Sequence, residues 1–513
     1  MQVHLMNPEQ AFDWRQPLPD GARDLAHDLA LDGVLSVMAG DDAFIRRVME
    51  HALLCSVADT RVIRYRQAAL QDCLNHSLVI REMYDLVCET LEKRRRYYLS
   101  GLASSPSSKL HAASDLIEMM AGSLSLLRDV ATDARDLFQS EGLRALITRL
   151  EQDLSEEYLD QMKSCLRELK FKDGIHIGMQ LGRGGKGVDY VLRGPGARPS
   201  TWRILSKRRP THSFRIADRD EAGYRALADI QDRGLLDVSK AVVQAAENMV
   251  DFFVQLKTEI AFYLGCVHLI NHLRTLQLPL CVPDPLDPES RGMRFDGLYD
   301  VGLALEVGGQ VVGNTLSAED VSLVVVTGAN QGGKSTFLRS LGLAQLFMQC
   351  GMYVPAKAYE MSMAQEVQSH FSRMEDAGMD RGKLDDELSR MSDVVDSIGP
   401  HSLLLMNESF AATNEREGAE IARGVVEALV DSGVKVVFVT HLWAFAEEWY
   451  NAPHHGVLFL RAERLSDGSR SYKMIQGPPL ETSFGVDLYR QIFTKTENLA
   501  EIADMAGCGR GET

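Results

Sequence analysis

One octapeptide constrains the fold of this chain more than any other feature. Residues 328–335 read G-A-N-Q-G-G-K-S, which matches the phosphate-loop pattern G-x-x-x-x-G-K-[S/T]. A β-type apolar run precedes the loop at 321–326, and an amphipathic helical pattern follows it at 335–350. Strand, loop and helix in this order are the context in which such a loop binds phosphate. The sequence therefore predicts a phosphate-binding loop within an α/β domain.

The residue types of this loop predict a nucleotide site that also holds magnesium. Glycines let the backbone curl so that amide N–H groups point at phosphate, and the positive end of the following helix dipole adds to the attraction. We expect the Lys334 ammonium to reach the β and γ phosphates, and the Ser335 hydroxyl to bind Mg²⁺. The residues predicted to bind nucleotide are Gly328, Asn330, Gly332, Gly333, Lys334, Ser335 and Thr336.

Two later strand ends complete the predicted site. The buried run 402–406 is followed by Asn407 and Glu408, where a phosphate loop needs an acidic partner. Glu408 is placed to orient or deprotonate an attacking water, whereas Asn407 brings no negative charge and predicts weaker Mg²⁺ binding. The strand predicted at 434–439 leads to His441, which is expected to sense the γ-phosphate. The predicted catalytic residues are Glu408, His441 and Lys334, and the predicted metal ligands are Ser335 and Asn407.

The rest of the chain divides by its patterns. Strands alternate with helices from about residue 297, which predicts a largely parallel sheet covered by helices. Apolar residues at three- and four-residue steps predict helices over 1–170 and a lever-like helix over 236–276. Short alternating runs, including 214–216, predict a small β insertion. The predicted ranges are a helical core (1–170), a basic β insertion (171–220), the long helix with a proline-rich link (221–296), the phosphate-loop domain (297–495) and a tail (496–513).

Charge and composition constrain the partners and the compartment. The eight cysteines form no Cys-x-x-Cys pair, which argues against a disulfide framework or zinc ribbon. No uninterrupted apolar run approaches the ~20 residues that span a bilayer, so we expect a cytoplasmic protein without membrane contact. The net charge of −17 does not favour nucleic acid, but the β insertion is locally basic. Its side chains either contact DNA phosphates or form a solvated surface. The DNA contacts predicted there are Arg198, Arg203, Lys207, Arg208 and Arg209.

Five segments resemble the MutS family of DNA mismatch repair ATPases. Residues 327–336 resemble the family's T-G-P-N-M-G-G-K-S-T, and residues 351–356 resemble its G-x-x-V-P-A. Residues 403–418 resemble its L-V-L-M-D-E-x-x-x-G-T-S-x-x-D-G. Residues 438–441 resemble its F-x-T-H, and residues 482–485 resemble its S-x-S-Y-G. The resemblance implies an ABC-type P-loop ATPase domain that uses ATP and Mg²⁺. It also implies a homodimer whose levers hold DNA, whether duplex, mismatched or branched.

Four features depart from the family pattern. Asn407 replaces an aspartate, and Val311 stands where the family has an aromatic residue that stacks on adenine. The segment 382–391, which would complete the partner's site, has acidic residues in place of S-T-F, and these would repel a γ-phosphate. No mismatch-reading domain is recognised. Its F-x-E motif occurs only at 445–447, where we expect Phe445 to pack within the ATPase domain.

Two functions follow from these patterns. The first is a MutS-type ATPase whose ATP binding and hydrolysis drive a dimeric clamp on DNA in repair, without direct mismatch readout. Such binding would rest on backbone phosphates and would be salt-sensitive. The alternative, favoured by Asn407 and the acidic residues 385–387, is a slow or inactive nucleotide-switched scaffold that binds a protein partner.

Overall fold

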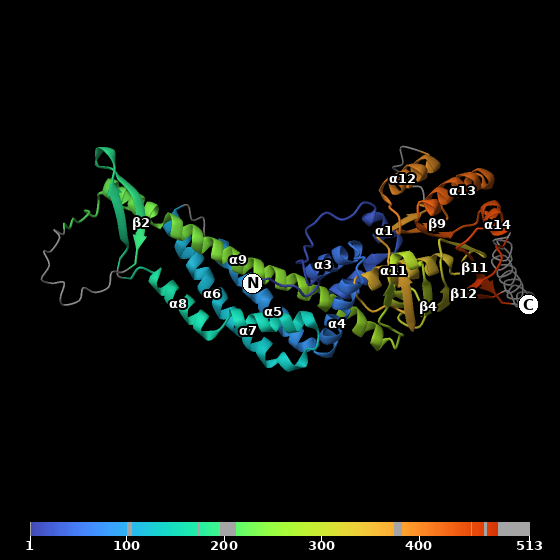
Figure 1. Cartoon of the computed structure of the whole chain (residues 1–513), viewed down its shortest axis with the longest axis horizontal. Helices are drawn as coiled ribbons and strands as arrows, with labels where there is room; N and C mark the ends of the chain where they lie inside the picture. The colour runs from blue at the N-terminus through green and yellow to red at the C-terminus, as the bar shows by residue number, and fades with distance from the viewer. Residues whose placement is uncertain are drawn as a thin grey trace, which may run out of the picture. The chain divides into compact units, whose positions relative to one another are not determined.

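The chain forms two compact units. The computed structural model describes residues 2–99, 105–172, 174–194, 212–373, 382–452, 454–465 and 469–480 (Figure 1). The first unit comprises Met1–Leu5, Glu9–Phe12 and Asn75–Ile260, and the second comprises Met6–Pro8, Asp13–Leu74 and Ala261–Thr513. This division differs from the ranges predicted above, because the helices of 13–74 pack with the carboxyl-terminal half. For example, the Cys350 thiol donates a hydrogen bond to the Ala52 carbonyl.

Helices dominate the first unit, as their apolar spacing predicts. The start of α6 shows why one helix begins where it does: Ser105 caps it by accepting the Ser108 N–H at 3.2 Å, and Pro106 follows at the first helical position. Leu110, Leu124 and Leu127 then lie on its buried face. The helices are α5 (Ser77–Leu99), α6 (Pro106–Asp133), α7 (Glu141–Asp153), α8 (Glu156–Glu168) and most of α9 (Glu221–Thr275).

The predicted β insertion is a hairpin. Strands β1 (His176–Leu181) and β2 (Gly187–Arg193) pair antiparallel. The expectation of a third strand at 214–216 is wrong, because this segment pairs with no strand in the described part of the chain, and Phe214 is 85% exposed. A run of three alternating residues can form too few backbone hydrogen bonds to make a stable strand without a partner. The five predicted DNA contacts, from Arg198 to Arg209, lie outside the described residues.

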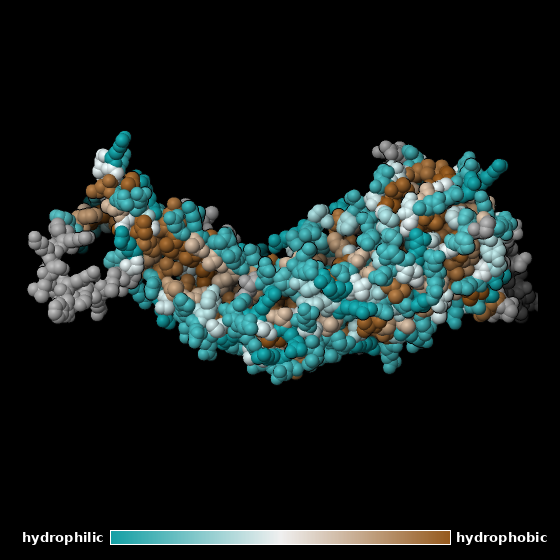
Figure 2. All heavy atoms as spheres, viewed as in Figure 1, coloured by the Kyte–Doolittle hydropathy of each residue, from teal (hydrophilic) through white to brown (hydrophobic). Residues whose placement is uncertain are grey.

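The lever-like helix is longer than predicted. Helix α9 has 55 residues and begins at Glu221 rather than near Leu236, which corresponds to a length of ~80 Å at 1.5 Å per residue. By length and composition alone it is apolar enough to cross a membrane, but 78% of its apolar window is buried inside the protein. Because most of this apolar window of α9 is already covered by protein, it is weak evidence for a membrane-spanning helix. Figure 2 shows hydrophobic residues at the surface where α6, α8 and α9 lie.

The second unit contains the predicted largely parallel sheet. Its six strands run in the order β12-β11-β6-β10-β9-β8, and every neighbouring pair is parallel except β11 with β12. The prediction of a largely parallel sheet is confirmed. The strands are β6 (Leu323–Thr327), β8 (Val367–Phe371), β9 (Leu403–Asn407), β10 (Lys435–Val439), β11 (Val457–Arg464) and β12 (Arg470–Gln476).

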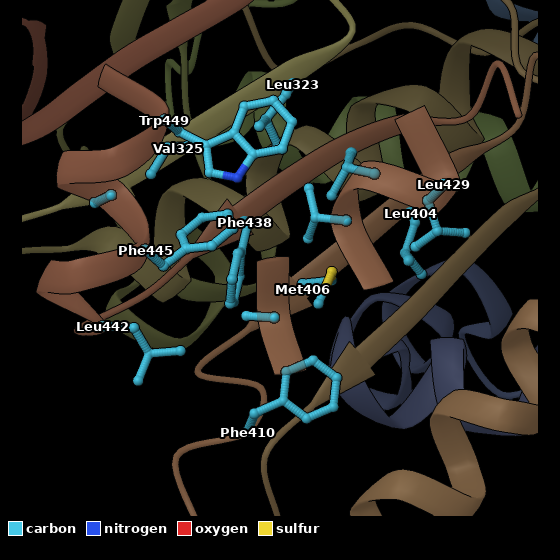
Figure 3. Packing of buried hydrophobic residues seen from close by; sticks show 14 of the residues in the cluster. Leu323, Val325, Leu404, Met406, Phe410, Leu429, Phe438, Leu442, Phe445 and Trp449 are labelled. Atoms are coloured by element: carbon cyan, nitrogen blue, oxygen red, sulfur yellow. The ribbon is translucent and has the colours of Figure 1, made fainter. Parts of the chain in front are cut away.

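Helices cover this sheet, and alternating strand residues form its core. Leu323, Met406 and Phe438 belong to one buried cluster with Phe445 and Trp449 of α14 (Figure 3). The predicted packing role of Phe445 is confirmed, since this side chain is buried with its ring 5.2 Å from that of Phe438. The helices around the sheet are α11 (Lys334–Gln349), α12 (Lys383–Ser397), α13 (Glu415–Asp431) and α14 (Trp443–Asn451).

A second sheet and five short helices complete this unit. The sheet was not predicted, because its strands are short and separated by loops and helices in the sequence. It runs in the order β3-β7-β4-β5, with only β3 and β7 parallel. The remaining elements are α1 (Ala22–Asp28), α2 (Leu31–Ala39), α3 (Ala43–Leu54), α4 (Thr60–Asn75), β3 (Asp284–Leu286), β4 (Met293–Leu298), α10 (Val301–Val307), β5 (Asn314–Ala318) and β7 (Ala358–Ser362).

Candidate nucleotide-binding site

The glycine-rich loop connects β6 directly to α11, as predicted. Gly328 and Gly333 have φ values of +109° and +89°, in the left-handed region that residues with a Cβ avoid. A Cβ on Gly332 would lie 2.7 Å from the Ala462 side chain and 2.8 Å from the Ala329 carbonyl oxygen. The curled backbone therefore requires all three glycines, and it places the loop at the amino end of α11.

The Lys334 ammonium is buried against the loop that precedes it. Its Nζ donates to the carbonyl oxygens of Gly328 at 2.9 Å and Ala329 at 3.1 Å. Burial lowers the pKa of Lys334 to about 8; the nearby Arg470 cation also lowers it, while the Glu408 carboxylate opposes the shift. The structure thus places an ammonium group at the centre of the loop, and this group loses its proton at a lower pH than an ordinary lysine does.

Parallel pairing of β9 and β10 brings the next two predicted residues together. Asn407, the last residue of β9, is paired with Val439, the last residue of β10. The residues that follow each strand meet at this sheet edge, and Glu408 Oε1 lies 3.1 Å from His441 Nε2. His441 Nε2 is also 3.4 Å from Lys334 Nζ. The hydrogen bond from His441 lowers the pKa of Glu408, although burial acts in the opposite direction.

The two predicted metal ligands are also adjacent. The Ser335 hydroxyl, at the start of α11, donates to Asn407 Oδ1 at 3.0 Å. Oxygen donors are the ligands Mg²⁺ prefers, and neighbouring positions in an octahedron with ~2.1 Å bonds are separated by ~3 Å. Within the described ranges, no cluster of three or more His, Cys, Asp or Glu side chains offers an alternative metal site. The pair therefore fits one edge of a Mg²⁺ coordination shell that water and phosphate oxygens would complete.

A pocket of about 450 Å³ opens beside the loop. Its volume lies in the range of small-molecule sites. Of the predicted residues, Asn330, Gly332, Gly333, Lys334, Ser335, Thr336 and Glu408 line it, and Gly328, Asn407 and His441 contact lining residues. Val311 lies in the pocket wall, and its predicted place beside the adenine base stays a prediction. The other apolar lining residues are Leu298, Leu303, Val307, Val312 and Phe337.

Two residues of the site were missed by sequence reasoning. Tyr472 lines the pocket, and Arg470 donates to Gln331 Oε1 at 2.9 Å. Both come from β12, the antiparallel strand at the end of the six-stranded sheet. No sequence motif marks them, because their proximity to the loop depends only on the order of strands in the sheet.

The contacts of the acidic segment 382–391 lie within its own domain. Residues from Lys383 onward form α12, and the side chain of Glu387 is buried, where it accepts the Phe410 N–H at 2.9 Å. Asp386 pairs with Arg390 at 3.4 Å. The Glu387 carboxylate is thus directed into its own domain. The expectation that the acidic residues of this segment would repel a partner's γ-phosphate stays a prediction. The last family-like segment, 482–485, lies outside the described residues.

A glycine loop between β6 and α11, backed by a parallel sheet, is typical of α/β phosphate-loop proteins as a class. Comparison with family models identifies the branch of that class. Residues 58–276 match the model of the MutS2 N-terminal domain, and residues 324–505 match MutS domain V, which is a P-loop ATPase domain. The chain belongs to the MutS family.

Curated relatives agree with this assignment. Endonuclease MutS2 of Streptococcus thermophilus is 28% identical over 243 residues, which cover 45% of this chain and 28% of the relative. DNA mismatch repair protein MutS 2 of Halobacterium salinarum is 27% identical over 183 residues, 36% of this chain and 21% of the relative. MutS protein homolog 4 of Homo sapiens is 25% identical over 183 residues, 34% of this chain and 20% of the relative. The match thus covers less than a third of each of these relatives.

Proposed function

We propose that this chain binds and hydrolyses ATP with Mg²⁺ and that the nucleotide controls a homodimeric clamp on DNA in repair. One observation carries the nucleotide half of the proposal: three separate segments converge on a single loop. Lys334 lies at the loop, Ser335 bonds to Asn407, and Glu408 bonds to His441. An ammonium at the phosphates, a hydroxyl at the metal and a residue that positions the attacking water are recurring parts of phosphoryl-transfer sites.

Each group has a distinct task in this proposal. Lys334 balances negative charge on the β and γ phosphates, and Ser335 and Asn407 would hold Mg²⁺, which supplies further positive charge at those oxygens. Glu408 orients the attacking water and accepts its proton, while His441 holds the Glu408 carboxylate and senses the γ-phosphate. Asn407 adds no charge to the metal site, so we expect slow turnover.

The DNA half of the proposal is supported by the matches outside the ATPase region. The MutS2 N-terminal domain model covers 58–276, which includes α9, and two of the relatives described above are named as a mismatch repair protein and an endonuclease. We propose contacts mainly to backbone phosphates, from Arg198 to Arg209, a cytoplasmic location, and no direct mismatch readout. Affinity should then fall steeply with salt.

Nucleotide binding by the purified full chain tests the first half. We expect a fluorescent ATP analogue to bind with Mg²⁺ present, and phosphate to be released slowly. Lys334→Ala should abolish binding or hydrolysis, while Lys357→Ala, at an exposed position outside the pocket, should behave as wild type. Absence of ATP binding by the wild-type chain would refute the proposal.

A gel-shift panel of homoduplex, mismatched and branched DNA at rising salt tests the second half. No retention at low ionic strength would refute DNA binding. The alternative function, a nucleotide-switched scaffold for a protein partner, is favoured by the uncharged Asn407 at the metal site. The two are separated by measuring ATP hydrolysis with and without DNA. Stimulation supports the clamp, and tight ATP binding with negligible, unchanged turnover supports the scaffold.

A further inference from the structure

The turn that follows β9 has an unusual backbone. Glu408 and Phe410, neither of them glycine, have φ values of +54° and +65°. Left-handed backbone is uncommon for residues with a Cβ, and it persists where the surroundings hold it in place. Glu408 is the residue proposed to orient water. The contacts that hold this turn therefore bear on the direction of its carboxylate.

A buried carboxylate on α12 holds one end of the turn. Glu387, only 2% exposed, accepts the Phe410 N–H at Oε1 over 2.9 Å. Burial raises the pKa of Glu387, whereas the backbone amides of Phe410 and Ala412 act to lower it. The Phe410 ring is fully buried at the edge of the sheet core (Figure 3). Phe410 is thus fixed both by its ring and by its amide.

His370 of β8 holds the middle of the turn. Its Nδ1 lies 2.7 Å from Ser409 Oγ, and its Nε2 lies 3.1 Å from the Glu387 backbone oxygen. Burial lowers the pKa of His370 to about 4, so the ring is neutral near pH 7. The single N–H of the neutral ring can then be donated from Nε2 to the Glu387 carbonyl. The Ser409 hydroxyl donates to the His370 backbone carbonyl at 2.9 Å and contacts Nδ1. The ring also stacks on Phe410, with centroids 5.9 Å apart.

We propose that Glu387 is a positioning residue for ATP hydrolysis: by accepting the Phe410 amide it fixes the turn and thereby the direction of the Glu408 carboxylate. This inference rests on the proposed ATPase function. A carboxylate is costly to bury when a neutral side chain would pack there, and here its Oε1 accepts the backbone amide two residues beyond Glu408. Glu387 is not among the residues that line the pocket.

Two variants and a matched control test the proposal. Glu387→Gln keeps the shape and one acceptor oxygen but removes the charge, and Glu387→Ala removes the acceptor. Asp396→Asn changes an exposed acidic residue on the same helix. We measure kcat, the Kd for the ATP analogue, and hydrogen exchange of the peptide spanning 408–413. Small displacements of a catalytic group cost up to about 100-fold in rate. We therefore expect kcat to fall about tenfold in Glu387→Gln and about 100-fold in Glu387→Ala, with Kd unchanged.

The exchange measurement separates this proposal from the proposed function. Exchange at 408–413 should be faster in both Glu387 variants and unchanged in Asp396→Asn, whether or not the chain hydrolyses ATP. In a Glu408→Ala background, Glu387→Ala should cause little further loss, because the carboxylate it positions is gone. A wild-type chain without ATP binding would overturn the proposed function alone. An active wild type with equal kcat in Glu387→Ala, or fully additive losses in the double variant, would overturn the role of Glu387. If Glu387→Ala does not fold, the Glu387→Gln comparison decides on the same criteria.

Discussion

Protonation of Lys334 should make ATP binding depend on pH between 7 and 9. Burial lowers the pKa of this ammonium to about 8, so it is ~90% charged at pH 7 and ~10% charged at pH 9. The charged form is the one that attracts phosphate. Since the folded-state pKa is depressed, this attraction is present below pH 8 and is lost as the pH rises through 8. Bound phosphate would raise the pKa again, so binding at pH 9 requires proton uptake.

The expected magnitude follows from these fractions. Free protein at pH 9 has about one-ninth of the charged Lys334 present at pH 7, so the Kd for ATP should rise about tenfold, ~1.4 kcal/mol. Titration with a fluorescent ATP analogue and Mg²⁺ at the two pH values measures this directly. The terminal phosphate does not confuse the result, because its second pKa is ~6.

Lys334→Arg is the matched variant for this experiment. Its guanidinium stays protonated throughout the range, so its Kd should be equal at pH 7 and pH 9 even if the absolute affinity is weaker. A wild-type Kd that does not change between these pH values would refute the reasoning about burial. A tenfold loss in Lys334→Arg as well would assign the pH dependence to another group.

Three further predictions concern neighbouring groups and the core. Glu408→Ala should keep ATP binding and lower kcat about 100-fold or more, because the water loses its base; single-turnover phosphate release measures this, and near-normal turnover would contradict it. Asn407→Asp should lower the Mg²⁺ concentration for half-maximal hydrolysis about tenfold, because it adds a charge to the metal site; an unchanged Mg²⁺ requirement would show that Asn407 does not face the metal. Phe445→Ala should reduce the free energy of unfolding by about 3–5 kcal/mol, because it leaves a cavity in the sheet core. Val395→Ala, at a half-exposed position of α12, should change the free energy of unfolding little. Urea denaturation of both variants provides the test.

Much of the site could be predicted because local sequence controls its parts. A glycine-rich loop needs backbone that only glycine adopts readily, so Gly328 and Gly333 were recognisable without a structure. Buried strands can likewise be recognised as short apolar runs, and the ends of two such runs identified Asn407, Glu408 and His441 as candidate site residues. The second sheet, the irregular 214–216 segment and the full extent of α9 were not predicted, since each depends on what the segment packs against.

What the sequence by itself determined was the chemistry available: a phosphate loop, a lysine, and polar residues at two strand ends. The tertiary structure alone decided which of them meet. Parallel pairing of β9 with β10 brings Glu408 to His441, and the strand order places Arg470 and Tyr472 of β12 beside the loop. Tertiary packing also buries Glu387 of α12, whose carboxylate accepts the Phe410 N–H. The physical reason is that periodicity specifies which face of an element is buried, whereas long-range packing specifies the neighbour that the face meets.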